Sequence, residues 1–339
     1  MLILYLIFIL ILILWGIKFK DNDDYISKER CNSIKGIFIL LIIFTHSMQY
    51  IGKSGYEFEG IDRTVSMFRN VIGQMVVVMF LFYSGYGVSL SVKKKGNSYV
   101  KSIPRRRLLS TLLNFDVAVM AYVVLNLLIS KPMTVSQVGL SLLAWDSVGN
   151  SNWYIFVILI CYAASYLVAI TPIKKNNWVW TFILLVICIF VLTPFKTPFW
   201  YNTILAYPAG SFFAEHQERI IPLLRKYYWL LLAGFTSIFV VSYYFLPGVN
   251  GFSTNLASIC FAFVIVMLSM KIVVGNAFLE WCGSHLFPLF IYQRIPMIVM
   301  YECLGTGFVK DNALLFVLIA LVTTCIISHF YKYWSFSFK

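Results

Sequence analysis

The chain has 339 residues, of which 60% are hydrophobic and only 12% charged, with a net charge of +13. Soluble globular proteins carry roughly a quarter charged residues, and a single aqueous core could not bury this much apolar surface. The composition therefore excludes a water-soluble fold and a disordered chain. The apolar runs are long and lack the alternation of β-barrel strands, and the seven cysteines include no CxxC pair that would indicate a zinc site or disulfide framework. We expect an all-α, polytopic membrane protein.

Apolar runs taken in chain order predict about ten or eleven membrane-spanning helices in a single domain over 1–339. Each span needs about twenty apolar residues, or fewer where flanking side chains reach the interface. The runs cover residues 2–18, 36–51, 71–92, 108–130, 153–171, 178–193, 199–214, 227–246, 252–270, 281–300 and 312–330. Pro208 and Gly210 interrupt the seventh run, which is the weakest. We interpret the first run as an extra, uncleaved N-terminal helix, because Lys18 and Lys20 follow it directly, and 36–330 as the core helices.

The positive charges distribute unevenly between the two sides that these runs define. Six of them would lie outside, namely Lys53, Arg63, Arg69, Lys131, Lys196 and Lys310, and Arg294 falls within a run. The other 20 of the 27 Lys and Arg residues, including Lys174, Lys175 and Lys339, would lie inside. Because positive residues stay cytoplasmic, we expect the N-terminus outside and the C-terminus in the cytoplasm. The basic character is explained by this asymmetry and by attraction to anionic lipids, so no nucleic-acid partner is predicted.

Two ionisable residues of the second run share one face of the predicted helix. His46 follows Lys35 by eleven positions, which at 100° per residue returns to within about 20° of the same face with a rise of about 16 Å. Ionisable groups inside a membrane are costly and are candidates for function. The alternative is a purely structural role, in which His46 is hydrogen-bonded to a neighbouring residue and Lys35 anchors the helix at the membrane surface.

A dense basic cluster follows the third run. It ends in Arg105, Arg106 and Arg107, directly after Pro104 at the start of the fourth run. Guanidinium groups present planar forks to phosphate oxygens, so three of them suit an anion with several phosphates. Anchoring of the cytoplasmic side is the alternative explanation.

The arrangement resembles the acyltransferase-3 family of integral membrane acyltransferases, many of which O-acetylate surface polysaccharides. The most specific feature is a basic residue, ten spacers and a histidine, matched by Lys35 and His46. Further similar segments are the aromatic Ser-Gly-Tyr element in Met79–Tyr86, the arginine cluster after it, the pair Trp153 and Tyr154, and the segment from Trp281 to Tyr292.

Some residues depart from the family pattern. Many members carry Arg where this chain has Lys35, which keeps the charge without the fork. The Arg-x-x-Arg spacing is missing, because Ser110 stands three positions beyond Arg107. In the tenth run many members have a histidine where Gln293 and Arg294 stand here.

The resemblance implies an enzyme of the cell membrane that takes an acyl group, most simply acetyl, from cytoplasmic acyl-coenzyme A. The acceptor would be a hydroxyl of a cell-surface or lipid-linked carbohydrate. His46 would be the general base, acting with Lys35 on the same face, with an acyl-histidine intermediate as the less favoured variant.

Donor and acceptor contacts follow from the same resemblance. Lys35 and the three arginines at 105–107 would bind the phosphates of acetyl-CoA, and no metal is expected. Ser84, Tyr86 and Trp153 would contact substrate, and the outer loops 52–70 and 131–152 offer the longest contact surfaces. Membrane lipids surround such a chain, and a homo-oligomer is compatible with it.

Two other functions compete with this interpretation. A transporter or flippase would also use broken helices and lone intramembrane charges, but no paired halves with matching interruptions are evident. A sensor or scaffold that kept the fold would survive the loss of Lys35 and His46. Asp116 and Arg294, both inside predicted spans, are candidates for a buried pair with each other or for contact with His46. The four scattered histidines show no metal-ligand spacing.

Overall fold

A computed structural model describes residues 1–171, 176–246 and 251–338. The all-α prediction is confirmed, because 80% of the chain is helical and the described strands form only one short antiparallel ladder. Within the described residues, seven helices are long and apolar enough to cross a membrane, and two shorter apolar helices accompany them. Lys174, Lys175 and Lys339, counted above among the inner charges, lie outside the described residues.

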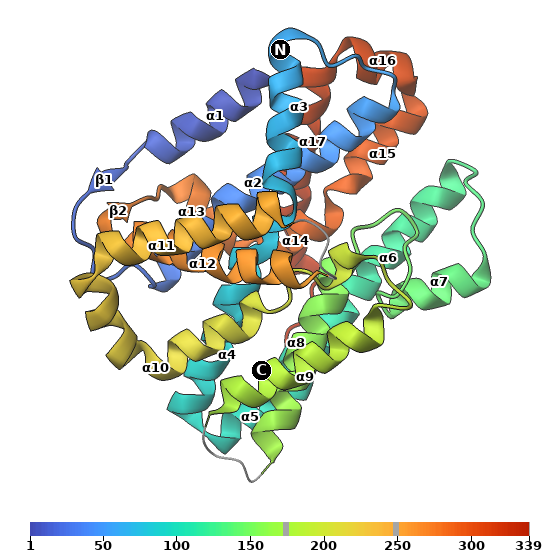
Figure 1. Ribbon diagram of the computed structural model, residues 1–339. Helices are drawn as coiled ribbons and strands as arrows, with labels where there is room; N and C mark the ends of the chain where they lie inside the picture. The colour runs from blue at the N-terminus through green and yellow to red at the C-terminus, as the bar shows by residue number, and fades with distance from the viewer. Residues whose placement is uncertain (172–175, 247–250, 339) are drawn as a thin grey trace.

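The first half of the chain supplies the central helix and the helices around it (Figure 1). Its elements are α1 (Ile3–Leu14), β1 (Lys18–Phe19), α2 (Lys28–Lys53), α3 (Gly60–Ile72), η1 (Gly73–Val77), α4 (Val78–Lys95), α5 (Asn97–Ile103), η2 (Pro104–Leu109), α6 (Ser110–Leu128), α7 (Val135–Leu142) and α8 (Trp153–Ile170).

The second half completes the bundle. Its elements are α9 (Asn177–Leu192), η3 (Pro198–Trp200), α10 (Ala206–Lys226), α11 (Tyr228–Val240), η4 (Val241–Phe245), α12 (Phe252–Lys271), β2 (Ile272–Val273), α13 (Ala277–Ser284), α14 (Leu286–Tyr292), α15 (Arg294–Cys303), α16 (Gly305–Asp311), α17 (Ala313–Phe330) and η5 (Tyr331–Tyr333). Each of the predicted apolar runs is helical in whole or in part. The weak run at 199–214 contains only the short turn η3 and the start of α10.

Helix α2 is the axis of the fold. The Ser27 hydroxyl accepts a hydrogen bond from the Arg30 backbone N–H at 3.3 Å, and Glu29 lies in the first turn, so the helix begins with a cap and a favourable charge. Its apolar middle is buried against α1, α4, α13, α14 and α17. The helix is unbroken from Lys28 to Lys53, so Lys35 and His46 lie on one continuous rod as the spacing predicts.

Two pairs of glycines allow helices to touch backbone to backbone. A Cβ on Gly36 of α2 would stand 2.1 Å from the Leu279 carbonyl oxygen of α13, and one on Gly283 would stand 1.9 Å from the Asn32 oxygen. The same reciprocal approach joins α4 and α10, where a Cβ on Gly85 would lie 2.0 Å from the Tyr207 oxygen. Small residues permit this packing within a membrane. The Ser-Gly element of α4 is therefore a site of close helix approach in an unbroken helix.

Two prolines break the tenth predicted span into α13, α14 and α15. Pro288 and Pro296 have no N–H to donate to the carbonyls four residues earlier, which belong to Ser284 and Tyr292. The helix is interrupted at those positions, since α13 ends at Ser284 and α14 ends at Tyr292. The second break places Gln293 and Arg294 at a junction between helices.

Segments predicted on the same side of the membrane are neighbours in the fold. The amino group of Met1 donates to the Asp62 carboxylate of α3 at 2.8 Å, and both were assigned to the outer side. Lys18 and Phe19 pair with Val273 and Ile272, which follow Lys271 on the predicted inner side. The orientation relative to the cytoplasm itself stays a prediction.

The glycine contact between α4 and α10 can be tested with a control on the same helix. We expect Gly85→Ala to destabilise the protein by about 1–3 kcal/mol, because the new methyl group would force backbones apart. Gly87→Ala should be close to neutral, since nothing lies within 4 Å of the place that its Cβ would take. Thermal unfolding of the purified protein in detergent measures both, and equal effects of the two substitutions would contradict this packing.

Candidate functional site

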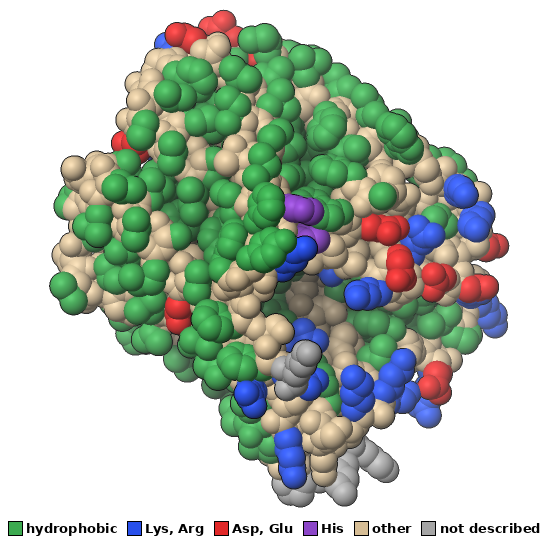
Figure 2. Space-filling view, turned by 180° about the vertical axis from the view of Figure 1, so that it is seen from behind, with side chains coloured by type: hydrophobic (Ala, Val, Ile, Leu, Met, Phe, Trp, Pro, Cys, Tyr) green, Lys and Arg blue, Asp and Glu red, His purple; other side chains and the backbone are tan. Residues whose placement is uncertain are grey.

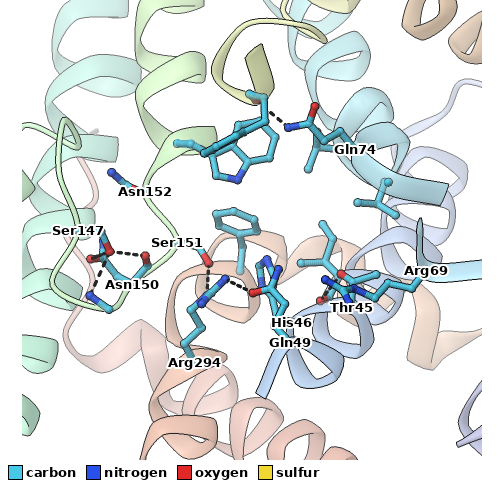
Figure 3. A pocket seen from close by; sticks show the side chains of 18 of the residues that line it. Thr45, His46, Gln49, Arg69, Gln74, Ser147, Asn150, Ser151, Asn152 and Arg294 are labelled. Carbon is cyan, nitrogen blue, oxygen red and sulfur yellow. Dashed lines mark hydrogen bonds between the residues drawn. The ribbon is translucent and has the colours of Figure 1, made fainter. Parts of the chain in front are cut away.

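A cavity of about 590 Å³ lies beside His46 and is lined by polar side chains (Figure 3). It is formed by α2, α3 and η1, by the loop between α7 and α8, and by the α14–α15 region. Its lining residues are Ile42, Thr45, His46, Gln49, Arg69, Asn70, Gly73, Gln74, Val76, Val77, Ser147, Gly149, Asn150, Ser151, Asn152, Trp153, Phe199, Phe290 and Arg294. Several of these belong to segments predicted outside, so in the predicted orientation the cavity belongs to the outer half of the protein.

His46 reaches this cavity from α2 and is half-buried. Its Nδ1 atom is buried and has no hydrogen-bond partner among the described residues. Gln293, at the α14–α15 junction, faces the imidazole, and its Oε1 is also buried without a partner. The Gln293 amide nitrogen donates to the Phe290 carbonyl at 2.9 Å, which directs its free oxygen away from that backbone group. The two unpaired atoms are complementary if Nδ1 carries the imidazole proton.

Arg294 is held in the cavity by two neutral groups. Its Nε donates to the Ser151 hydroxyl at 2.8 Å and its Nη2 donates to the Gln49 carboxamide oxygen at 2.9 Å. In Figure 3 His46 lies between Arg294 and Arg69, and Arg69 comes from the last turn of α3. Two guanidinium groups thus flank the histidine.

The loop before α8 is braced by its own polar side chains. The Asn152 amide donates to the Ala144 and Asp146 carbonyls at 3.0 and 2.8 Å, and Ser147 donates to the Asn150 carbonyl at 2.7 Å. These bonds satisfy buried backbone groups and give Ser151 a fixed place beside Arg294. A row of polar residues directly before an apolar helix is the sequence signal for this loop, although it did not identify Ser151.

Lys196 supports the same loop from outside the membrane-spanning helices. Its Nζ donates to the Trp145 carbonyl at 2.6 Å and lies over the Trp145 and Trp200 rings, 3.9 and 4.1 Å from their centroids. Burial lowers the pKa of Lys196 from its ordinary value. The cation therefore fastens the loop to the segment after α9.

Lys35 lies near the other end of α2 and does not line this cavity. It is half-buried, with Lys28 and Cys31 among its neighbours, and no hydrogen bond or ion pair of the described residues includes it. The rise of an unbroken helix separates it from His46 by about 16 Å along the axis. Lys35 and His46 therefore lie in different surroundings on one helix.

The three consecutive arginines point in different directions, as expected for successive positions on a helix. Arg107 is half-buried, donates from Nε to the Tyr99 hydroxyl at 3.2 Å and lies over the Tyr162 ring. Arg105 and Arg106 are exposed, and the Arg105 guanidinium lies 5.0 Å from the centre of the Phe338 ring. The helix is wider over η2, where Pro104 cannot donate to the preceding turn. Figure 2 shows a face where Lys and Arg side chains gather around a hollow.

Of the three residues predicted to contact substrate, only Trp153 lines the His46 cavity. Ser84 and Tyr86 lie on α4, where the Tyr86 hydroxyl donates to the Gln217 carboxamide oxygen of α10 at 3.1 Å. Tyr86 therefore belongs to the α4–α10 contact, and Ser84 does not line the His46 cavity.

The suggested pair of Asp116 and Arg294 is not formed. Arg294 bonds to Ser151 and Gln49, whereas the Asp116 Oδ1 atom is buried without a partner among the described residues. No cluster of three or more His, Cys, Asp or Glu side chains in the described part of the chain could hold a metal ion. Sequence reasoning also missed Gln49 and Arg69 as cavity residues, because they lie on α2 and α3 and belong to no recognisable motif.

Comparison with known proteins assigns a family. The family model described as Acyltransferase domain, acyltransferase-3, matches residues 28–332, so the match begins with α2 and leaves α1 before it. No curated protein and no solved structure matches the chain significantly. With a helical membrane architecture and a match over nearly the whole chain, the protein belongs to the acyltransferase-3 family and is a membrane acyltransferase.

Proposed function

We propose that the protein transfers an acyl group, most simply acetyl, from cytoplasmic acyl-coenzyme A to a hydroxyl of a carbohydrate at the outer side of the cell membrane. One observation carries the proposal. The polar cavity beside His46 and the partly buried Lys35 lie toward opposite ends of a single unbroken helix. A donor that spans the distance between them brings its thioester to the histidine.

The lining of the cavity suits a sugar. Hydroxyl and carboxamide groups of Thr45, Gln49, Asn70, Gln74 and the loop before α8 can exchange hydrogen bonds with hydroxyls, and Trp153 offers an aromatic surface. Family membership supports acyl transfer and does not favour a transporter or flippase.

His46 acts as general base in the proposed reaction. The Nδ1–H group is directed at Gln293, which leaves the Nε2 lone pair free to take the proton of the acceptor hydroxyl. As that proton leaves, the hydroxyl oxygen attacks the thioester carbonyl carbon. The tetrahedral intermediate then collapses, the C–S bond breaks, and the coenzyme A thiolate leaves with the proton from the imidazolium. Arg294 is positioned near enough to His46 to stabilise charge on the carbonyl oxygen.

The donor phosphates bind at the predicted inner side. Arg106 is exposed and free to form forked contacts with phosphate, while Arg107 is held by Tyr99 and Tyr162 and provides a fixed positive charge. Lys35, near the start of α2, would contact the donor between its phosphates and its acyl end.

The general-base role predicts the effect of His46→Gln. Transfer of labelled acetyl from acetyl-coenzyme A by the purified, reconstituted protein should fall at least about a hundredfold, because no other group takes the hydroxyl proton. The variant should keep the thermal unfolding midpoint of the wild type. Normal transfer by His46→Gln would show that another residue is the base, and substrate movement without chemical change would favour the transporter.

The donor site predicts a different kinetic change. The double substitution Arg106→Gln with Arg107→Gln should raise the KM for acetyl-coenzyme A by about 10- to 100-fold with kcat largely kept, because charge-assisted hydrogen bonds to phosphate are lost. Lys131→Gln removes an exposed cation from the predicted outer side and serves as the control. An unchanged KM in the double variant would show that these arginines do not bind the donor and only anchor the cytoplasmic side.

Gln293 is proposed as a positioning residue for His46. Gln293→Leu should lower kcat by about tenfold or more with the donor KM unchanged, because the imidazole loses the acceptor that fixes its tautomer. A loss of stability alone would lower the amount of active protein without changing kcat per folded molecule. Steady-state kinetics normalised to folded protein distinguishes these outcomes, and an unchanged kcat would exclude the positioning role.

A further inference from the structure

The His46 cavity carries two positive charges and no negative one. Arg69 and Arg294 both line it, and no Asp or Glu among the described residues does. Both guanidinium groups are half-buried, and both lie close enough to His46 to influence it electrostatically. Two like charges that face one cavity favour the binding of an anion there.

The partners of these arginines leave their charges uncompensated. Arg294 donates only to Ser151 and Gln49, which are neutral. Arg69 takes part in no hydrogen bond or ion pair of the described residues. On the opposite side of the protein, by contrast, Lys93, Arg225 and Lys271 each pair with a carboxylate.

The carboxylates on α3 and in the loop before α8 are engaged elsewhere. Asp62 precedes Arg69 by two helical turns on α3, but it accepts hydrogen bonds from the Met1 amino group and from the Tyr56 hydroxyl. Asp146 accepts from the Ser147 backbone N–H at 2.7 Å within the loop before α8. A ligand that enters the cavity can supply the counter-charge that its lining residues lack.

We infer that the acceptor is anionic and that its carboxylate or phosphate group binds between Arg69 and Arg294, next to the hydroxyl that His46 activates. This inference rests on the proposed function and names the class of acceptor. Guanidinium groups recognise carboxylate and phosphate through paired hydrogen bonds, and two of them facing one cavity discriminate against neutral sugars.

Replacing Arg69 tests anion binding without removing Arg294, the group proposed to stabilise the thioester carbonyl oxygen. Arg294 is fixed beside His46 and has a second role there, whereas Arg69 lies on the other side of His46 and makes no hydrogen bond or ion pair among the described residues. Loss of Arg69 therefore weakens recognition of the anion and leaves the neutral part of the acceptor site intact.

The test measures binding and transfer separately with the full-length protein in lipid nanodiscs. The probes are methyl β-glucuronide, methyl β-glucoside and glucose 1-phosphate, and the proteins are the wild type, Arg69→Gln, Arg69→Lys and Arg63→Gln. Arg63 is an exposed cation on the same helix as Arg69 and does not line the cavity, so it is the matched control. Binding is read from ligand-dependent thermal shifts, and transfer from release of coenzyme A.

We expect the wild type and Arg63→Gln to bind at least one anionic probe about tenfold more tightly than the glucoside. Arg69→Gln should lose this preference without weakening the glucoside, and Arg69→Lys should keep part of it. Preference for the glucuronide identifies a carboxylate, and preference for the sugar phosphate identifies a phosphate.

Equal binding of charged and neutral probes by the wild type would overturn the inference, as would an equal loss of all probes in Arg69→Gln. Anionic preference without coenzyme A release supports the anion site and argues against the proposed reaction. Coenzyme A release that is as fast with the glucoside as with the charged probes supports the reaction and argues against an anionic acceptor.

Discussion

The close contact of α2 with α13 is the constraint on which the rest of the site depends. Gly36 and Gly283 bring two backbones so near that a methyl group at either position would overlap a carbonyl. This contact fixes α2 over the turn that carries Lys35, and the prolines after α13 then determine where the following helices break. The second break presents Gln293 and Arg294 to His46. The packing of α2 on α13 and the helix breaks at the two prolines thus place the polar residues of the cavity together inside an apolar protein.

The predicted inner and outer halves of the protein differ in how their positive charges are compensated. Three exposed cations on the predicted inner side are paired with carboxylates, whereas Arg294 in the predicted outer cavity donates to neutral groups. Because α2 runs without a break, it sets the separation of Lys35 and His46 at about 16 Å along its axis. The cavity loop before α8 adds rigidity through its own asparagine and serine hydrogen bonds, so the acceptor side is formed before any substrate arrives.

Much of the fold followed from local properties of the sequence. The apolar runs predicted the helices, and the eleven-residue spacing placed Lys35 and His46 on one face, because both depend only on helical geometry. The other polar residues of the His46 cavity could not be predicted, since Gln49, Arg69 and Ser151 reach it from different elements and carry no motif. Pro288 and Pro296 indicate the helix breaks at Ser284 and Tyr292, but the apolar run over 281–300 has the length of one span and was interpreted as a single helix. The pairing of Asp116 with Arg294 failed because helix neighbours depend on packing across the whole bundle.

We propose that His46 meets the acyl end of a donor whose phosphates lie at the opposite end of α2. A cryo-electron microscopy structure with a non-hydrolysable thioether analogue of acetyl-coenzyme A tests this arrangement directly. We expect the acyl carbonyl in the cavity beside the His46 imidazole, with the phosphates near Lys35 and the arginines at 105–107. An analogue bound with its acyl end away from His46, or with its phosphates in the cavity of Arg69 and Arg294, would show that this arrangement is wrong.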